Sequence, residues 1–334
     1  MITDLQRMMR HVEEARMQRD RGVLVVAVNR AGDTRLRQKP GAMLLLTESG
    51  AISGSMAGQE FVKDLLNDAE QWIDAEGPGL MSYSLHEEYL RYLGDGEEEP
   101  PSLDVLYYPL NPENNYAPVL PIFDRVQYGE GVTFSCVTET THEDWQLGDY
   151  VLQDNVGDVF ASNRPDKSVI PDQVAPFHFV IDPPLHLLIF GGGAPSRPLV
   201  RLARTMGWRI SLVEDRPECL EAEWLSEVDH LLELSPDDLE SVPVTRFAVI
   251  MPHDFDKELA YLEELAQRSM KYIGLAGVRE RADKLLFTLA GKSQEAAERI
   301  GPVVRAPAGL TLGGDDDAAI ALAITAEIQQ IFAG

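Results

Sequence analysis

Three consecutive glycines, Gly191–Gly193, mark the segment whose residue types and spacing point most clearly to chemistry. An apolar stretch precedes them, and the next apolar stretch ends in Glu214-Asp215, 23 and 24 residues after Gly191. Glycines let the backbone turn tightly beside a phosphate, which the following helix N-terminus stabilises. An acid about 20 residues further on accepts hydrogen bonds from ribose hydroxyls. Ser196 replaces the third glycine of G-x-G-x-x-G. The spacing therefore predicts either a phosphate or nucleotide site at Gly191, Gly193 and Asp215 or a turn with a purely architectural role.

Two later apolar stretches also end next to polar side chains. His253 and Asp254 follow TRFAVIMP (245–252), and Arg279 lies two residues after KYIGLAG (271–277). Ligands bind off the carboxyl ends of parallel strands, so we expect His253 and Arg279 at the same crevice. Asp254 either lines this crevice or caps the next helix. Arg279 either holds a phosphate or is ordinary surface charge.

Arg216 and the two cysteines are the remaining residues with possible chemical roles. Arg216 follows the Glu-Asp pair, where it either reaches a phosphate or pairs with Glu218. Cys136 lies on an expected strand, and Cys219 lies beside acids that raise the pKa of a thiol. We therefore expect two buried, structural cysteines rather than an activated nucleophile, and we assign no catalytic residue and no metal ligand.

A basic cluster in the first half is a second candidate anion site. The chain has 29 basic and 55 acidic residues, a formal net charge of −26, and a pI near 4.5. Within 25–59, by contrast, Asp33 and Glu48 are outnumbered by four basic residues: Arg30, Arg35, Arg37 and Lys39. A local excess of positive charge in so acidic a chain indicates anion binding.

The acidic composition excludes several classes of protein. A pI near 4.5 argues against a nucleic-acid binder and against docking onto anionic lipid. The apolar runs fall short of the roughly 18 residues of a membrane helix, and the first residues lack an apolar signal core. We expect a cytoplasmic protein without membrane insertion.

Hydrophobic periodicity indicates which elements position these residues. In the first half it predicts two helices, a hairpin at 42–55 and several strands: helices 3–20 and 58–75, strands 23–30, 103–110, 131–140 and 149–162. The proline-rich stretch 163–185 lacks a clear period. In the second half strands and helices alternate: strands 185–190, 208–215, 245–252 and 271–277, and helices 195–206, 256–268, 278–290 and 315–332.

This order predicts an α/β protein with two domains. Alternating strands and helices form a doubly wound parallel sheet of the Rossmann type. We therefore expect an N-terminal α/β domain over 1–165, a linker over 166–184 and a Rossmann-like domain over 185–334.

Nearly the whole pattern resembles the xanthine dehydrogenase accessory factor family, XdhC/CoxI. In the first half the resemblance rests on VVAVNRAGDTRLRQKPGAMLLLTESGAISGSMAG (25–58). In the second half five segments carry it: LLIFGGG (187–193), RISLVEDRPE (209–218), HDFDKEL (253–259), YIGLAGVRERADKL (272–285) and APAGLTLGGDDDAAIALAITAEI (306–328). The chain departs from the family pattern at Gln59-Glu60, where members often have further small residues.

The resemblance implies a chaperone that binds molybdenum cofactor and inserts it into an apo-molybdoenzyme of the xanthine dehydrogenase type. A homodimer, and a cysteine desulfurase as a further partner, are implied in the same way. In this interpretation the phosphate of the cofactor is held by Arg35, Arg37 and Lys39. Its dithiolene approaches the backbone at Gly54, Ser55 and Gly58. Two other interpretations stay open: an NAD-dependent Rossmann oxidoreductase, and an interaction protein with a degenerate cofactor site.

Overall fold

The computed structural model describes residues 2–28, 40–56, 59–84, 102–164, 170–171, 174, 176–251 and 254–333. By its internal contacts the chain divides into two compact units, Met1–Pro183 and Pro184–Gly334. None of the described helices combines the length and apolar character needed to cross a membrane.

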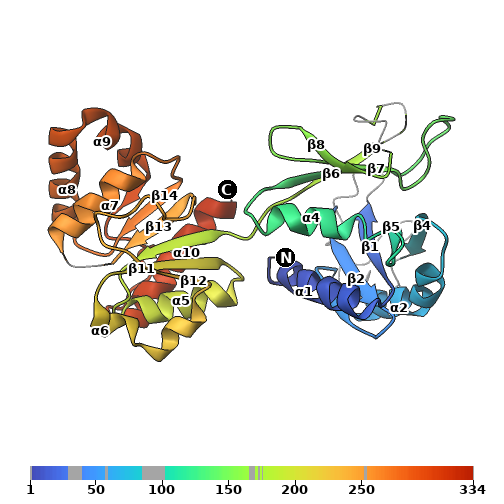
Figure 1. Cartoon of the computed structure of the whole chain (residues 1–334), viewed down its shortest axis with the longest axis horizontal. Coiled ribbons are helices and arrows are strands. Elements are labelled where there is room, and N and C mark those ends of the chain that lie inside the picture. The colour runs from blue at the N-terminus through green and yellow to red at the C-terminus, as the bar shows by residue number, and fades with distance from the viewer. Residues whose placement is uncertain are drawn as a thin grey trace, which may run out of the picture. The chain divides into compact units, whose positions relative to one another are not determined.

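A five-stranded antiparallel sheet forms the centre of the first unit (Figure 1). Its strand order is β3-β2-β1-β5-β4, built from β1 (Gly22–Val28), β2 (Met43–Thr47), β3 (Ile52–Gly54), β4 (Gly79–Ser84) and β5 (Ser102–Leu110). The expected hairpin is confirmed as the β2–β3 pair. Strand β4 was not expected, because its Gly-Pro-Gly approach indicates only a break.

Both faces of this sheet are covered, which is why β1 is buried along its whole length. Helices α1 (Ile2–Gln18) and α4 (Val119–Val126) pack on one face, where Leu24 and Val26 point. Helix α2 (Gln59–Ile73) packs through Leu65 and Trp72 on the other face.

A smaller antiparallel sheet completes the first unit. Its order is β8-β7-β6-β9, from β6 (Val132–Val137), β7 (Tyr150–Gln153), β8 (Val159–Ser162) and β9 (Pro176–Ile181). Phe134 and Leu152 of this sheet join the core beneath α1 and α4. Strand β9 lies within the stretch expected to be a linker; prolines hid its alternation of apolar and polar residues.

The second unit contains the expected parallel sheet, in the order β12-β11-β10-β13-β14-β15. Its strands are β10 (His186–Phe190), β11 (Arg209–Glu214), β12 (His230–Glu233), β13 (Phe247–Ile250), β14 (Tyr272–Leu275) and β15 (Val304–Arg305). Strands β12 and β15 are additions to the expected set. The order reverses direction between β10 and β13, as in a Rossmann fold.

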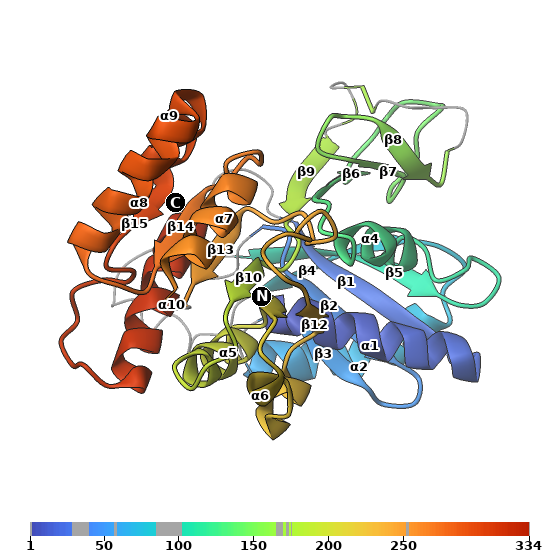
Figure 2. The same cartoon turned by 60° about the vertical axis from the view of Figure 1, so that its left-hand side comes forward.

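Helices cover both faces of the parallel sheet (Figures 1 and 2). On one face lie α5 (Ser196–Thr205) and α10 (Asp317–Ala333). The opposite face carries α7 (Phe255–Leu265) and α8 (Arg279–Lys292), with α9 (Gln294–Ile300) against α8. Short connecting turns are α6 (Pro217–Leu220) and two 3-10 turns, Glu223–Glu227 and Gly301–Val303. The Rossmann-type prediction for this half is confirmed.

Candidate functional site

The carboxyl ends of β10, β11, β13 and β14 border one edge of the parallel sheet. Gly191–Gly193 follows β10, and Asp215 follows β11. Asp254 begins the turn into α7 after β13, and Arg279 opens α8 after β14. His253 lies outside the described residues. The described candidates of this half therefore share the crevice edge that the sheet topology predicts.

The glycine turn keeps few backbone donors for a ligand. Gly191 has φ +96°, its N–H donates to the Val213 carbonyl at 2.9 Å, and its own carbonyl accepts the Ser196 hydroxyl at 2.5 Å. The N–H groups of Ser196 and Arg197 donate to the carbonyls of Gly193 and Ala194. Pro195 has no N–H. Of this turn's described N–H groups, those of Gly193 and Ala194 remain for an anion.

Glu214 is hydrogen-bonded to the glycine turn. Its side chain is 2% exposed, and its carboxylate accepts the Gly192 N–H at 2.6 Å. The Arg216 guanidinium donates to both carboxylate oxygens, from Nε at 2.9 Å and from Nη2 at 2.7 Å. The N–H groups of Asp215 and Arg216 each add a bond of 3.0 Å.

This environment keeps Glu214 ionised. Burial alone raises the pKa of a carboxyl, but the hydrogen bonds from Arg216 and Gly192 outweigh it and lower the pKa of Glu214 to about 2. A carboxylate thus occupies the Gly192 N–H, which a phosphate oxygen would otherwise use. Arg216 pairs with Glu214 and not with Glu218, which corrects one of the two alternatives that the sequence allows for it.

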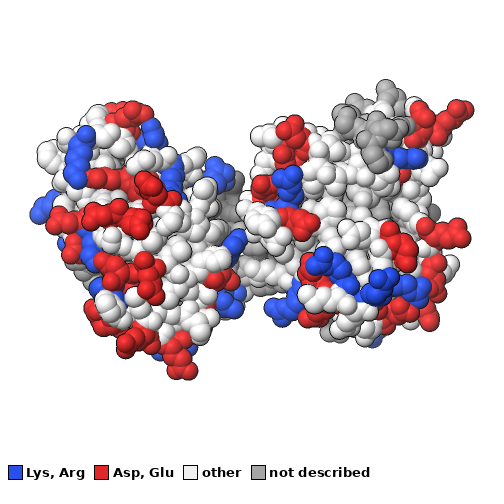
Figure 3. Space-filling view, viewed as in Figure 1, with Lys and Arg blue, Asp and Glu red and all other residues white. Residues whose placement is uncertain are grey.

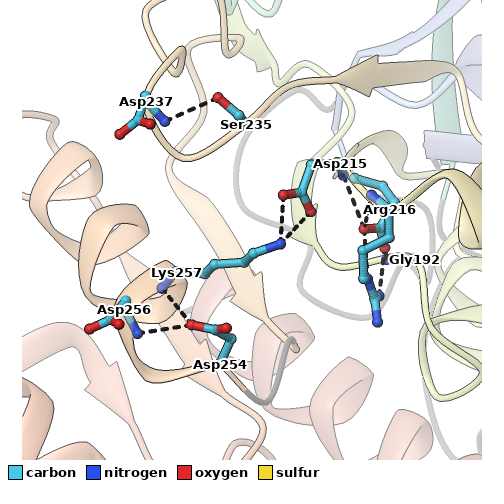
Figure 4. A network of polar contacts seen from close by, with 9 residues as sticks. Gly192, Asp215, Arg216, Ser235, Asp237, Asp254, Asp256 and Lys257 are labelled. Carbon is cyan, nitrogen blue, oxygen red and sulfur yellow. Dashed lines mark hydrogen bonds and ion pairs between the residues drawn. The ribbon is translucent and has the colours of Figure 1, made fainter.

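Asp215, the expected ribose acceptor, already has a cationic partner. Both of its carboxylate oxygens accept from Lys257 Nζ, at 2.7 and 2.5 Å (Figure 4). Lys257 lies in the first turn of α7, and that turn is capped by Asp254, whose Oδ1 accepts the N–H groups of Asp256 and Lys257. The capping role for Asp254 is therefore the observed one. Both acids proposed for a ribose diol are engaged by side chains of this unit.

The two arginines of α8 have different roles. Arg279 is exposed at the first position of α8, and no ion pair involves it within the described part of the chain. Arg281 donates from Nε to the buried carboxylate of Glu258 at 2.7 Å and lies over the Phe255 ring. Of these two arginines, Arg279 is therefore the one available to an incoming anion.

In the first unit, the expected cofactor loop joins two fixed ends. Arg35, Arg37, Lys39 and Gly58 lie outside the described residues. Both loop ends are bonded to each other, since the Gly41 N–H donates to the Ala27 carbonyl at 2.9 Å and the Ala27 N–H to the Ala42 carbonyl at 2.8 Å. Strand pairing brings the last residues of β1 and β3 and the first residues of β2 together at one end of the sheet.

Gly54 and Ser55 are described, and both contact the start of β2. Gly54 has φ +149°, and a Cβ there would lie 2.2 Å from the Met43 carbonyl oxygen, so strand pairing itself requires glycine. The Ser55 N–H donates to the Met43 carbonyl at 2.8 Å, and its hydroxyl accepts the Met43 N–H at 3.4 Å. Within the described residues the hydroxyl proton of this half-buried serine has no acceptor, so it can donate to a ligand.

The departure at Gln59-Glu60 coincides with the beginning of α2. The side chains of these two residues lie outside the described part of the structure.

The two cysteines differ in burial. Burial raises the pKa of the Cys136 thiol to about 12. Cys219 is only partly buried, which corrects the expectation of a buried side chain; burial and nearby Glu214 raise its thiol pKa. Both thiols are protonated at neutral pH. Among the described residues, no cluster of His, Cys, Asp or Glu could hold a metal ion.

The observed partners of Lys257 and Arg216, Asp215 and Glu214, were not predicted from the sequence. Both lie in segments that carried the family resemblance, 253–259 and 209–218. Lys257 comes three residues after the capping Asp254, a spacing that predicts a side chain near the crevice. Its partner depends on how α7 packs beside the end of β11, which the sequence does not specify.

Comparison with known proteins identifies both halves of the chain. Residues 187–328 match the family model of the XdhC Rossmann domain, and residues 15–84 match that of the XdhC and CoxI family. A curated protein of Bacillus subtilis (strain 168), named as a probable subunit of xanthine dehydrogenase, is 27% identical over 154 residues. The aligned part is 45% of this chain and 44% of that protein, so the match spans less than half of the relative's length.

A solved structure shares the fold along nearly the whole chain. It comes from Bacillus halodurans and is described as that of a xanthine dehydrogenase. It is 22% identical, covers 96% of this chain and 93% of its own, and superposes with a TM-score of 0.72.

Proposed function

Since the chain belongs to the XdhC and CoxI family, we propose that it is an accessory protein of a xanthine dehydrogenase system that binds molybdenum cofactor and delivers it to the apo-enzyme. The name of the Bacillus subtilis relative supports the link to such a system. Bound to the client, the cofactor supplies the redox centre; this chain holds and releases it.

One observation supports the binding proposal: Gly41 and Ala42, which follow the basic segment in the sequence, are bonded to Ala27 at the same end of the five-stranded sheet as Gly54 and Ser55. The phosphate and dithiolene of the cofactor are anionic, so they need cations and hydrogen-bond donors. Arg35, Arg37 and Lys39 supply the cations, and the Ser55 hydroxyl supplies a donor. The bonds between Ala27 and Gly41–Ala42 hold both ends of the loop at that edge.

We assign the Rossmann crevice to a phosphate-bearing ligand without hydride transfer. The N–H groups of Gly193 and Ala194 and the exposed Arg279 are the donors that support anion binding. Glu214 and Asp215 are engaged by Arg216 and Lys257, which does not favour a ribose contact. The oxidoreductase interpretation therefore has less support than the accessory role.

The binding proposal is tested on protein purified from a molybdenum-replete host. Molybdenum is measured by mass spectrometry and pterin by fluorescence after oxidation. We expect about one molecule of cofactor per chain in the wild-type protein. Arg35→Ala with Arg37→Ala should lower affinity tenfold or more, since each charged hydrogen bond contributes about 1.5–3 kcal/mol.

A matched control removes the same charge elsewhere in the first unit. Arg7 and Arg10 are exposed on α1, so Arg7→Ala with Arg10→Ala should leave cofactor content unchanged. Equal cofactor content in the loop variant and this control would place the site away from 35–39. Absence of pterin from every preparation would contradict the binding proposal.

A further inference from the structure

A groove opens between the β2–β3 hairpin and α2, with a volume of about 300 Å³. Its apolar wall is formed by six side chains: Leu46, Ala51, Ile52, Leu66, Ala69 and Ile73. Leu46 and Ala69 belong to the buried core beneath α2, whereas Ile52 is 42% exposed and Leu66 is 39% exposed. Two large aliphatic side chains therefore face solvent above a buried apolar floor, an arrangement typical of a binding surface.

The rim of the groove is acidic. Arg21 holds the hairpin and the end of α2 together, donating to both Glu48 oxygens at 3.1 and 2.8 Å and to Asp74 at 2.7 Å. Glu70 is exposed on the rim, and no ion pair involves it within the described part of the chain. The rim thus carries one arginine, Arg21, and three acidic residues, Glu48, Glu70 and Asp74.

This charge balance disfavours an anionic ligand and favours a cationic one. The groove therefore does not suit the phosphate-bearing cofactor. Acidic side chains are interspersed with basic ones over the visible faces of both units (Figure 3). The chain's formal net charge of −26 attracts a basic partner before contact.

The groove borders a sheet edge that pairs with no further strand among the described residues. Strand β3 is the outermost strand, with β2 as its one neighbour among the described strands. The Ala51 carbonyl and the Ser55 N–H bond to Thr47 and Met43 on β2. Because antiparallel strands alternate the direction of their polar groups, the backbone groups of Ile52 and Gly54 point away from β2. An extended segment can bond to this edge and place alternate side chains in the groove.

We propose that this groove docks the client enzyme of the proposed function through an extended segment with a large apolar side chain beside a lysine or arginine. The apolar side chain covers Ile52 and Leu66, and the cationic one pairs with Glu70. The docking rests on the proposed accessory role.

The position of the groove suits delivery. It lies at the turn end of the β2–β3 hairpin, whereas Gly54 and Ser55, the two expected cofactor residues that are described, lie at the Met43 end. The five residues of β2 separate the two ends by roughly 15 Å. A client bound at the groove is thus held near the cofactor edge without competing for its contacts.

The test measures binding of the purified full chain to the apo-molybdoenzyme of the same source by calorimetry. Ile52→Glu with Leu66→Glu places charge on both exposed walls and should weaken binding at least tenfold. Glu70→Lys should also weaken it, and added salt should weaken wild-type binding. Met17→Glu is the matched control: Met17 is 78% exposed on α1, outside the groove, and its variant should bind like the wild type.

Cofactor content, measured on the same preparations, separates this proposal from the binding proposal. If the client binds through the groove but this chain contains no cofactor, the docking proposal is supported and the proposal that the chain delivers cofactor is contradicted. Equal client binding by wild type and the double variant overturns docking, as does absence of wild-type binding. If the double variant instead dissociates a wild-type oligomer and leaves client binding intact, the groove holds a second copy and the proposal is wrong.

Discussion

Replacing Arg216 with alanine should destabilise the Rossmann unit through the glycine turn. The substitution removes two charged hydrogen bonds, of 2.9 and 2.7 Å, from a carboxylate that is 2% exposed. Each such bond contributes about 1.5–3 kcal/mol in general. The Arg216 side chain is 40% exposed, so solvent screens the pair and the lower values apply. We expect a loss of about 3 kcal/mol.

Three backbone bonds keep this loss from being larger. The N–H groups of Gly192, Asp215 and Arg216 still hold the Glu214 carboxylate in the variant. Arg216→Lys should recover about half of the loss, because an ammonium supplies the charge but not the two-pronged geometry. Arg201→Ala is the control. Arg201 is 53% exposed and pairs with Glu227, so its removal should cost less than about 1 kcal/mol.

Hydrogen exchange of the β10 and β11 amides is the appropriate assay, because a chain of two units need not unfold in one step. The pKa of Glu214 is lowered from 4.5 to about 2, so its contribution to stability is complete above pH 4.5. It is lost as the pH falls towards 2, and this loss should be smaller in Arg216→Ala. An Arg216→Ala effect no larger than that of Arg201→Ala would refute the reasoning.

Two further predictions concern stability. Burial lowers the pKa of His186 to about 4, below the ordinary 6.5, so stability should fall as the pH drops from 6.5 to 4. His186→Asn should flatten this fall by about 2 kcal/mol in acid unfolding curves, and an unchanged pH dependence would contradict the burial argument. Gly54→Ala should cost the first unit about 3 kcal/mol or more, because a Cβ meets the Met43 carbonyl at 2.2 Å. Gly50→Ala, at φ +92° with open space around it, should cost only about 1 kcal/mol, and equal losses in thermal melts would contradict the steric explanation.

The alternating second half was predictable because each strand is an apolar run bounded by a turn. Strands β10, β11, β13 and β14 all have this form. In the helices of this half the apolar residues recur at the 3.6-residue period, which distinguishes them from the strands. Strand β12 was missed because three of its four residues are exposed, so burial left no pattern in the sequence. Strand β15 has only two residues, which is too short for any period.

The site was predictable in its location but not in its contacts. The rule for parallel sheets is enough to place Gly191, Asp215 and Arg279 at one sheet edge. The partners of Glu214 and Asp215 depend on side-chain reach across β10, β11 and α7, which residue spacing does not encode. The groove at Ile52 and Leu66 was equally hidden, because each residue alone reads as part of an amphipathic element.

Transfer of cofactor to the client tests the central claim most directly. Cofactor-loaded protein is mixed with apo-enzyme of the xanthine dehydrogenase type, and the enzyme's activity is followed together with loss of molybdenum from this chain. We expect activity to appear in proportion to the molybdenum lost, and the variant Arg35→Ala with Arg37→Ala to yield little activity and little molybdenum loss. Retention of all molybdenum by the wild-type chain, with the apo-enzyme still inactive, would contradict the account.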